Sequence, residues 1–335
     1  MVEPRIVSSI FPQLPAGSMR AFRISLAVGV ALVFLLGAVG LFPVALVAAA
    51  ILLPVVTVMY LYDVEVYEDE PALVLGLTMI WGAIAGAGLT LLMMAIAPID
   101  ATSVVTDDSS AVIDRAVLFP LISVPLMLAG ALVLLPYRRF NDVLDGTTFG
   151  VASAAAFISV VTLVSGFDYL DEGLSPAGLI VPWLVRLAVV AVAVPLFTTS
   201  SVGAVAGAFW LRYRAPVRDR AALGLLGQPP FALVLAAVLF VAANLIEVLL
   251  PGGLVLALLL VLDALALVWL RQVIHIGLLE EAAEIEIGPD IVCANCGSRT
   301  PSHTFCSNCG ISLRALPKGR APEAPSPPAI AEAPA

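Results

Sequence analysis

The sequence predicts an all-α polytopic membrane protein of about eight transmembrane helices, with a small cysteine-bearing module at its C-terminal end. Three observations support this fold class: an apolar composition, eight apolar runs of membrane-spanning length, and two C-x-x-C pairs. Hydrophobic residues make up 61% of the 335 residues and charged residues 12%, and the mean hydropathy is +1.07. So little charge cannot cover a water-soluble globule of this size, which excludes a soluble domain.

Each of the eight runs has the length needed to cross a bilayer. A hydrocarbon core about 30 Å thick takes about 20 helical residues. The first run is long for a signal peptide and is followed at once by a second run, so we expect it to be a span. Pro195 is expected to kink or break the sixth run, which overfills the bilayer. The runs cover residues 22 to 42, 44 to 62, 73 to 97, 116 to 136, 147 to 166, 182 to 211, 231 to 250 and 254 to 274.

The distribution of basic residues predicts that both termini are cytoplasmic. Eight crossings from a cytosolic N-terminus place 14 of the 16 Lys and Arg residues in the inner segments or at their edges. Only Arg115 and Arg186 depart from this pattern, and the outer loops are acidic. Because cytoplasmic loops carry an excess of Lys and Arg, we expect a multi-pass protein of the cell membrane with both ends inside.

All four cysteines lie in the stretch "CANCGSRTPSHTFCSNCG", residues 293 to 310. They form two C-x-x-C pairs, and a glycine that permits a tight turn follows each pair. Cytosolic thiols stay reduced, so four thiolates at this spacing predict one structural Zn²⁺ per chain, with a redox dithiol or an incidental pair as the alternatives. His303, between the pairs, is interpreted as a surface residue. The predicted zinc ligands are Cys293, Cys296, Cys306 and Cys309.

Changes of composition divide the chain into five parts. The acidic linker reads "GLLEEAAEIEIGPD", and the last segment is rich in Pro and Ala without apolar periodicity, which is typical of disorder. The predicted parts are a cytosolic N-terminal tail (1 to 21), a transmembrane bundle (22 to 276), an acidic linker (277 to 290), a zinc ribbon (291 to 313) and a disordered tail (314 to 335).

Ionisable residues inside spans are costly and suggest function by default. Asp263 lies near the middle of the last run and Glu247 near the outer end of the seventh. A tight turn at Pro251 makes these helices antiparallel, so we expect Asn244 to hydrogen-bond Asp263 across the hairpin, with a proton or ion relay as the alternative. Arg186 is interpreted as snorkelling toward an interface.

Glycines recur at four-residue spacing in two of the runs. Gly82 and Gly86 lie in the third run, and Gly203 and Gly207 in the sixth. Small residues at this spacing let helix backbones approach closely, so we expect close helix contacts at both pairs.

Three stretches resemble a known family in order and spacing. They are "YLYDVEVYEDEPALVLGLTMIWGA" (60 to 83), "NDVLDGTTFGVASAAAF" (141 to 157) and "AVPLFTTSSVGAVAG" (193 to 207). They resemble the Asp…Glu-Pro segment before a Trp-Gly helix, the Asp-Gly-x-x-Tyr-Gly…Phe segment and the His-Pro-Leu-Phe-Thr…Gly helix of PrsW-type intramembrane proteases. Asn244 falls where that family often has a Trp-Asn pair. The resemblance covers roughly residues 43 to 280 and implies a peptidase scaffold in the membrane.

The family's catalytic signature is missing from this sequence. The family has Glu-Glu-x-x-Lys after Ala-Pro, and the corresponding stretch here is "FPLISVPLM" (119 to 127). An intramembrane hydrolase needs a general base, and usually a metal, to activate water, and these replacements cannot serve. Ser123 and Val124 stand for the two glutamates, Met127 for the lysine, Val161 for a later glutamate and Val194 for the histidine.

The sequence therefore predicts a non-catalytic PrsW-like integral membrane protein, a pseudoprotease that acts by binding. Its cytosolic zinc ribbon is expected to dock a protein partner, and no nucleic-acid partner is expected. One alternative is an active intramembrane peptidase that uses displaced residues such as Asp142, Asp145, Glu247 or Asp263. Asp142 and Asp145 are explained more simply as helix-start residues. A small-solute transporter is the other alternative, but only the sixth run contains a break near the midplane.

Overall fold

The computed structural model describes residues 20–65, 72–96, 113–171, 180–215, 224–284, 289–293, 297–302, 306, 308 and 313. Nearly all of this part of the chain is helical. Its helices are α2 (Arg20–Ala38), α3 (Phe42–Glu65), α4 (Ala72–Ile96), the π-helix η1 (Asp114–Leu118), α6 (Phe119–Leu132), α7 (Val143–Asp171), α8 (Ile180–Ala188), the π-helix η2 (Val189–Ala193), α9 (Val194–Tyr213), α10 (Pro229–Leu249) and α11 (Gly252–Glu284). Two strands follow, β1 (Asp290–Val292) and β2 (Arg299–Pro301).

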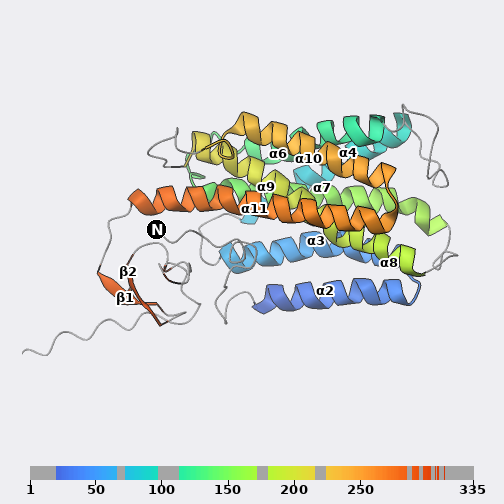
Figure 1. Cartoon of the computed structure of the whole chain (residues 1–335), viewed down its shortest axis with the longest axis horizontal. Coiled ribbons are helices and arrows are strands. Elements are labelled where there is room, and N and C mark those ends of the chain that lie inside the picture. Colours follow the sequence, from blue (N-terminus) through green and yellow to red (C-terminus); the bar gives the residue numbers. More distant parts are fainter. Residues whose placement is uncertain are drawn as a thin grey trace, which may run out of the picture.

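Six helical segments of the described chain are long and apolar enough to cross a membrane, which makes this an all-α polytopic membrane protein. They lie side by side along the long axis of the molecule (Figure 1). Each corresponds to one of the predicted runs. The first and fourth runs form shorter apolar helices, Phe22–Ala38 and Ala116–Leu132. The six long segments are Phe42–Met59, Leu73–Ile96, Val143–Gly166, Ile180–Tyr213, Pro229–Leu249 and Gly252–Gly277.

The first helix is shorter than its apolar run because a glycine ends it. Gly40 has φ 85°, a left-handed conformation that side chains with a Cβ rarely adopt. Its N–H donates to the Gly37 carbonyl at 3.0 Å, and the Leu41 N–H donates to the Leu36 carbonyl at 2.9 Å. This pair of bonds is a Schellman motif, which turns the chain from α2 into α3.

Both π-helices directly precede a proline. Pro120 is the second residue of α6, after η1, and Pro195 is the second residue of α9, after η2. A proline ring clashes with the carbonyl four residues earlier and offers no N–H, so a wider turn there relieves the conflict. The sequence predicts a kink or break at Pro195, and the structure has the π-helix η2 just before it, but α8, η2 and α9 continue as one segment of 34 residues.

Helix α7 occupies the middle of the bundle and packs against α3, α4, α6, α9 and α11. The main apolar core lies around it, and its largest fully buried side chains include Phe149, Phe157 and Trp210. Helix α2 lies at the edge of the bundle and packs on α3 and α8 (Figure 1). A smaller apolar cluster that includes Val33 and Leu187 lies between α2 and these two helices.

Gly82 and Gly86 bring the backbones of α4 and α7 together. A Cβ atom added at Gly82 would lie 2.1 Å from the Ser153 carbonyl oxygen, and one at Gly86 would lie 2.6 Å from the Phe157 carbonyl oxygen. Real Cβ atoms do not approach backbone this closely, so only glycine permits the contact. The close helix packing predicted from this glycine spacing is confirmed.

Gly203 and Gly207 allow α9 to pack closely against both α7 and α11. A Cβ atom at Gly207 would lie 2.6 Å from Thr147 of α7 and 2.8 Å from Val273 of α11. One at Gly203 would lie 3.4 Å from Leu270 of α11. Gly203 lies beside Leu270, and Gly207 lies beside Val273. Residue numbers rise along both helices from the first contact to the second, so α9 and α11 run in the same direction. The close contact predicted for this second glycine pair is also confirmed.

Candidate functional site

A short antiparallel hairpin presents the first cysteine pair. Strands β1 and β2 pair Asp290 with Pro301 and Val292 with Arg299, which places Cys293 directly after β1. The hairpin lies beyond the C-terminal end of α11 (Figure 1). At its open end, the Ser302 N–H donates to the Pro289 carbonyl at 3.0 Å. The turn between the strands therefore coincides with the C-x-x-C-G segment.

A glycine shapes the turn after Cys293. Gly297 has φ 69°, and its N–H donates to the Cys293 carbonyl at 2.8 Å. The Cys293 N–H in turn donates to the Ser298 carbonyl at 2.9 Å. The tight turn predicted at the glycine that follows the first cysteine pair is confirmed, and the left-handed backbone explains why glycine is needed.

The two described cysteines are among the most buried residues of the hairpin unit. Cys293 is 1% exposed and Cys306 is 2% exposed. The Asn308 side-chain amide donates to the Ser298 hydroxyl at 2.8 Å, which ties the second cysteine segment to the turn of the first. Cys296, Cys309 and His303 lie outside the described residues. Within the described residues there is no group of three His, Cys, Asp or Glu side chains that could hold a metal ion.

Asp142 and Asp145 cap the N-terminus of α7. The Asp142 N–H donates to the Asp145 carboxylate at 3.0 Å, and the Leu144 N–H donates to the Asp142 carboxylate at 3.3 Å. This reciprocal arrangement is a capping box in which aspartates satisfy backbone donors left over at the helix start. The helix-start role predicted for both residues is confirmed.

The hydrogen bond predicted between Asn244 and Asp263 is wrong. The Asn244 amide donates to the Phe240 carbonyl of its own helix at 2.9 Å, and neither Asp263 oxygen has a partner in the described structure. Counted from the turn at Pro251, Asn244 lies 7 residues before it and Asp263 lies 12 residues after it. At 1.5 Å per residue, the two positions differ in depth by about 7 Å.

Two of the other charges in the spans act on each other. Arg186 of α8 interacts electrostatically with Glu247 of α10. The interpretation of Arg186 as snorkelling toward an interface does not include Glu247, although the sequence places the two residues at similar depth. Arg186 lies soon after the start of the sixth run, and Glu247 lies near the end of the seventh. Both residues therefore lie near the predicted outer face of the membrane.

Helix α9 also holds the turn between α6 and α7, a role that sequence reasoning missed. The buried Trp210 indole donates to the Phe140 carbonyl at 3.2 Å. The Arg214 guanidinium donates to the Leu135 carbonyl near the end of α6. In the sequence, Arg214 contributed only to the orientation signal, because charge counting does not reveal which carbonyl an arginine will reach.

The five positions that the sequence comparison matched to a peptidase signature lie in or beside the apolar core. Val124 and Met127 of α6 are buried in the main cluster, and Val161 of α7 and Val194 of α9 pack against it. The Ser123 hydroxyl is buried and donates to the Pro120 carbonyl of its own helix at 3.1 Å. Three helices therefore bring these positions to one core, and four of the five contribute apolar side chains to it.

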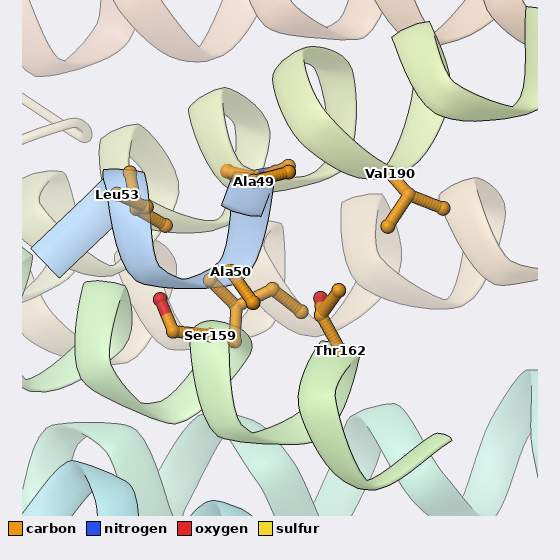
Figure 2. Close-up of a pocket in the computed structure, with 8 residues that line it drawn as sticks. Ala49, Ala50, Leu53, Ser159, Thr162 and Val190 are labelled. Carbon is orange, nitrogen blue, oxygen red and sulfur yellow. The ribbon is translucent and has the colours of Figure 1, made fainter. Parts of the chain in front are cut away.

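A small hollow lies between α3, α7 and the π-helix η2. It has no room for a water molecule, and its polar lining residues are Ser159 and Thr162 (Figure 2). The Ser159 hydroxyl donates to the Ala155 carbonyl at 2.7 Å. No charged side chain lines the hollow, so it lacks the acid and base that hydrolysis requires.

No family model, curated protein or solved structure matches this chain. Functional inference therefore rests on the residues described above.

Proposed function

We propose that this chain is a non-catalytic PrsW-like integral membrane protein, a pseudoprotease that acts by binding. Its bundle anchors a cytosolic zinc ribbon, and the ribbon docks a protein partner. The observation that carries the proposal is the apolar core at Val124, Met127, Val161 and Val194. The family resemblance would require acids, bases or metal ligands at these positions, and packed aliphatic side chains cannot activate water.

The carboxylates considered for a displaced peptidase site have other roles or stand alone. Asp142 and Asp145 bind backbone donors at the start of α7. Glu247 interacts with Arg186, and Asp263 is isolated from both. A hydrolytic site needs at least two such groups around one water molecule, so this arrangement supports binding over catalysis.

The π-helix η2 gives little support to the alternative that the protein is a transporter. Broken helices near the midplane of both halves would be typical of a transporter. The π-helix η2 lies inside its span, but η1 occupies the first residues of its own segment. The two breaks are therefore not equivalent positions of a repeated half.

The proposed orientation has eight crossings with both termini in the cytosol. Helices α2 and α6 supply the two short crossings, each about 25 Å long at 1.5 Å per residue, and the charge asymmetry supports the direction. A reporter fused after Leu313 tests this arrangement. Activity of a cytosolic reporter is expected, whereas a reporter active only outside the cell would contradict it.

We infer that Cys293, Cys296, Cys306 and Cys309 hold one structural Zn²⁺. The described half of this donor set fits a thiolate site, because Cys293 and Cys306 are buried and the glycine turn after Cys293 has the required shape. Bound zinc would cross-link two strands of three residues each, too few to build a core of their own. Metal analysis of the purified full chain should give one zinc per chain. A chain without zinc would contradict the inference.

The binding role is tested with the whole protein in membranes. Photocrosslinking from the exposed Val292 should capture a specific cytosolic protein, and deletion of residues 291 to 313 should disturb the cellular role. The purified protein should leave candidate transmembrane substrates uncut. If it cleaves one, and Asp145→Asn or Asp263→Asn abolishes the cleavage, the displaced-site peptidase replaces this proposal.

A further inference from the structure

Asp263 is a buried carboxyl group in the middle of a span. It lies 11 residues into the segment Gly252–Gly277, about 16 Å along the helix at 1.5 Å per residue. Its side chain is 3% exposed, and it lies on the same stripe of α11 as the fully buried Leu259 and Ala266. The carboxyl group is therefore enclosed by neighbouring helices and does not face the lipid.

No group of the described structure compensates a negative charge at this position. Neither carboxyl oxygen has a hydrogen-bond partner, and no charged side chain interacts with it electrostatically. The side chains of Asp168 and Asp171, at the far end of α7, lie outside the described residues. The other described titratable groups on α11 and on the helices packed against it are Asp145 (α7), Arg186 (α8), Arg212 and Tyr213 (α9), Glu247 (α10), Arg271 and His275 (α11).

An ionised carboxylate in such a place is costly. Burying a charge without a partner costs several kcal/mol, whereas the neutral acid is only a polar group. We propose that Asp263 is a proton-binding site: its carboxyl group carries a proton at neutral pH and exchanges it with solvent along the contact between α9 and α11.

Other buried polar atoms without a hydrogen-bond partner lie on the same two helices, α9 and α11. In the described structure, the remaining buried side-chain polar atoms without a hydrogen bond are the Ser201 hydroxyl on α9 and the Trp269 and Arg271 nitrogens on α11. Helices α9 and α11 run in the same direction, and Gly203 lies beside Leu270. Ser201 therefore lies at a level of α11 that is nearer to its C-terminal end than Asp263 is. These groups extend from Asp263 toward the C-terminal end of α11, the side assigned to the cytosol. Of these groups, only the Ser201 hydroxyl can both accept and donate a hydrogen bond, so it is the one that can pass a proton, whereas the indole and guanidinium nitrogens are donors only.

Infrared spectroscopy of the full chain in lipid nanodiscs tests the proposal. At neutral pH, we expect a C=O stretching band of a protonated carboxyl group that shifts in deuterated buffer. Asp263→Asn should remove this band, because the amide is neutral and nearly isosteric, and Glu247→Gln and Asp145→Asn should retain it. The proposal fails if the wild-type and Asp263→Asn spectra are the same, or if the band does not shift in deuterated buffer.

A second variant guards against misfolding of Asp263→Asn. In protein whose aspartates carry ¹³C at the side-chain carboxyl, the band should appear at the labelled frequency. In equally labelled Asp263→Glu, the band should return to the unlabelled frequency, because the new acid carries no label. Persistence of a labelled band in Asp263→Glu would assign the proton to another aspartate and overturn the proposal. Neither the zinc ribbon nor the binding role enters this test.

Discussion

The helical bundle and the cysteine hairpin are stabilised in different ways. The bundle buries Phe149, Phe157 and Trp210 in one continuous core that several helices share. In the hairpin unit, all three residues of β1 are exposed, and the described buried side chains are Cys293, Thr300 and Cys306. Packing across many residues can stabilise the first region, whereas we have proposed that the second depends on a metal bound by its cysteines. Each region should therefore fail under a perturbation that leaves the other intact.

The largest expected effect is loss of the hairpin fold in Cys306→Ser. Structural zinc supplies roughly 10–16 kcal/mol in small zinc-finger peptides at neutral pH, so removal of one thiolate should release the metal and unfold this unit. We expect loss of bound zinc and rapid proteolysis within residues 291 to 313, with the thermal unfolding of the bundle unchanged. Ser302→Ala, which keeps the backbone bond to Pro289, is the control. Equal protease resistance of both variants would contradict metal-dependent folding.

Gly82→Ala makes the reverse test, because it should damage the bundle and spare the hairpin. The added Cβ atom would lie 2.1 Å from the Ser153 carbonyl oxygen and force α4 away from α7. We expect a loss of about 3 kcal/mol in the free energy of unfolding in detergent, with zinc content unchanged.

Gly88→Ala is the matched control on the same helix, since no atom lies within 4 Å of the added Cβ. The control should be neutral or slightly stabilising, because alanine favours a helix more than glycine does. Equal destabilisation by both substitutions would show that the contact between α4 and α7 is not the cause.

A smaller loss is expected from Trp210→Phe, which removes the hydrogen bond to the Phe140 carbonyl. A buried acceptor left without its donor costs about 1–3 kcal/mol, so the bundle should unfold at lower temperature. Trp81→Phe removes a comparable bond to the Leu126 carbonyl at 2.8 Å, but its side chain is 41% exposed and should cost less. Calorimetry of both variants ranks the two effects. A larger loss from Trp81→Phe would contradict this ranking.

The smallest effect is expected from Asp142→Ala, which removes half of the capping box of α7. Loss of such a cap costs about 1 kcal/mol, whereas Asp142→Asn should retain most of the stability because asparagine also caps helices. Hydrogen exchange at the Leu144 amide should be faster in the alanine variant than in the asparagine variant. Equal protection in the two variants would argue against the capping role.

Local sequence features predicted several parts of the structure correctly. The apolar runs correspond to the helices, since helix length in a bilayer follows from residue count. The glycine spacing at Gly82 and Gly203 predicted close helix contacts, and Gly297 predicted a tight turn. The start of α7 at Asp142 was predicted in the same way. In each case, the cause lies within a few residues of the chain.

Features that depend on how two helices align could not be predicted in this way. The end of α2 at Ala38 is different, because it is local: the run is apolar to residue 42, and hydropathy alone does not reveal the Schellman bonds at Gly40 and Leu41. Asn244 and Asp263 were expected to meet, but their distances from the turn differ. The electrostatic interaction of Arg186 with Glu247 depends on the lateral distance between α8 and α10, which the similar depth of the two residues does not determine.

The sequence by itself determined that this is an all-helical membrane protein and that its cysteines are concentrated in one short segment. Both conclusions follow from composition and spacing, which do not depend on the packing of the chain. Only the tertiary structure decided that Asp263 is buried with no partner among the described residues and that the positions around Val124 and Met127 belong to an apolar core. Burial and partnership depend on the rotation and depth of each helix against its neighbours, and many side chains at once determine these quantities.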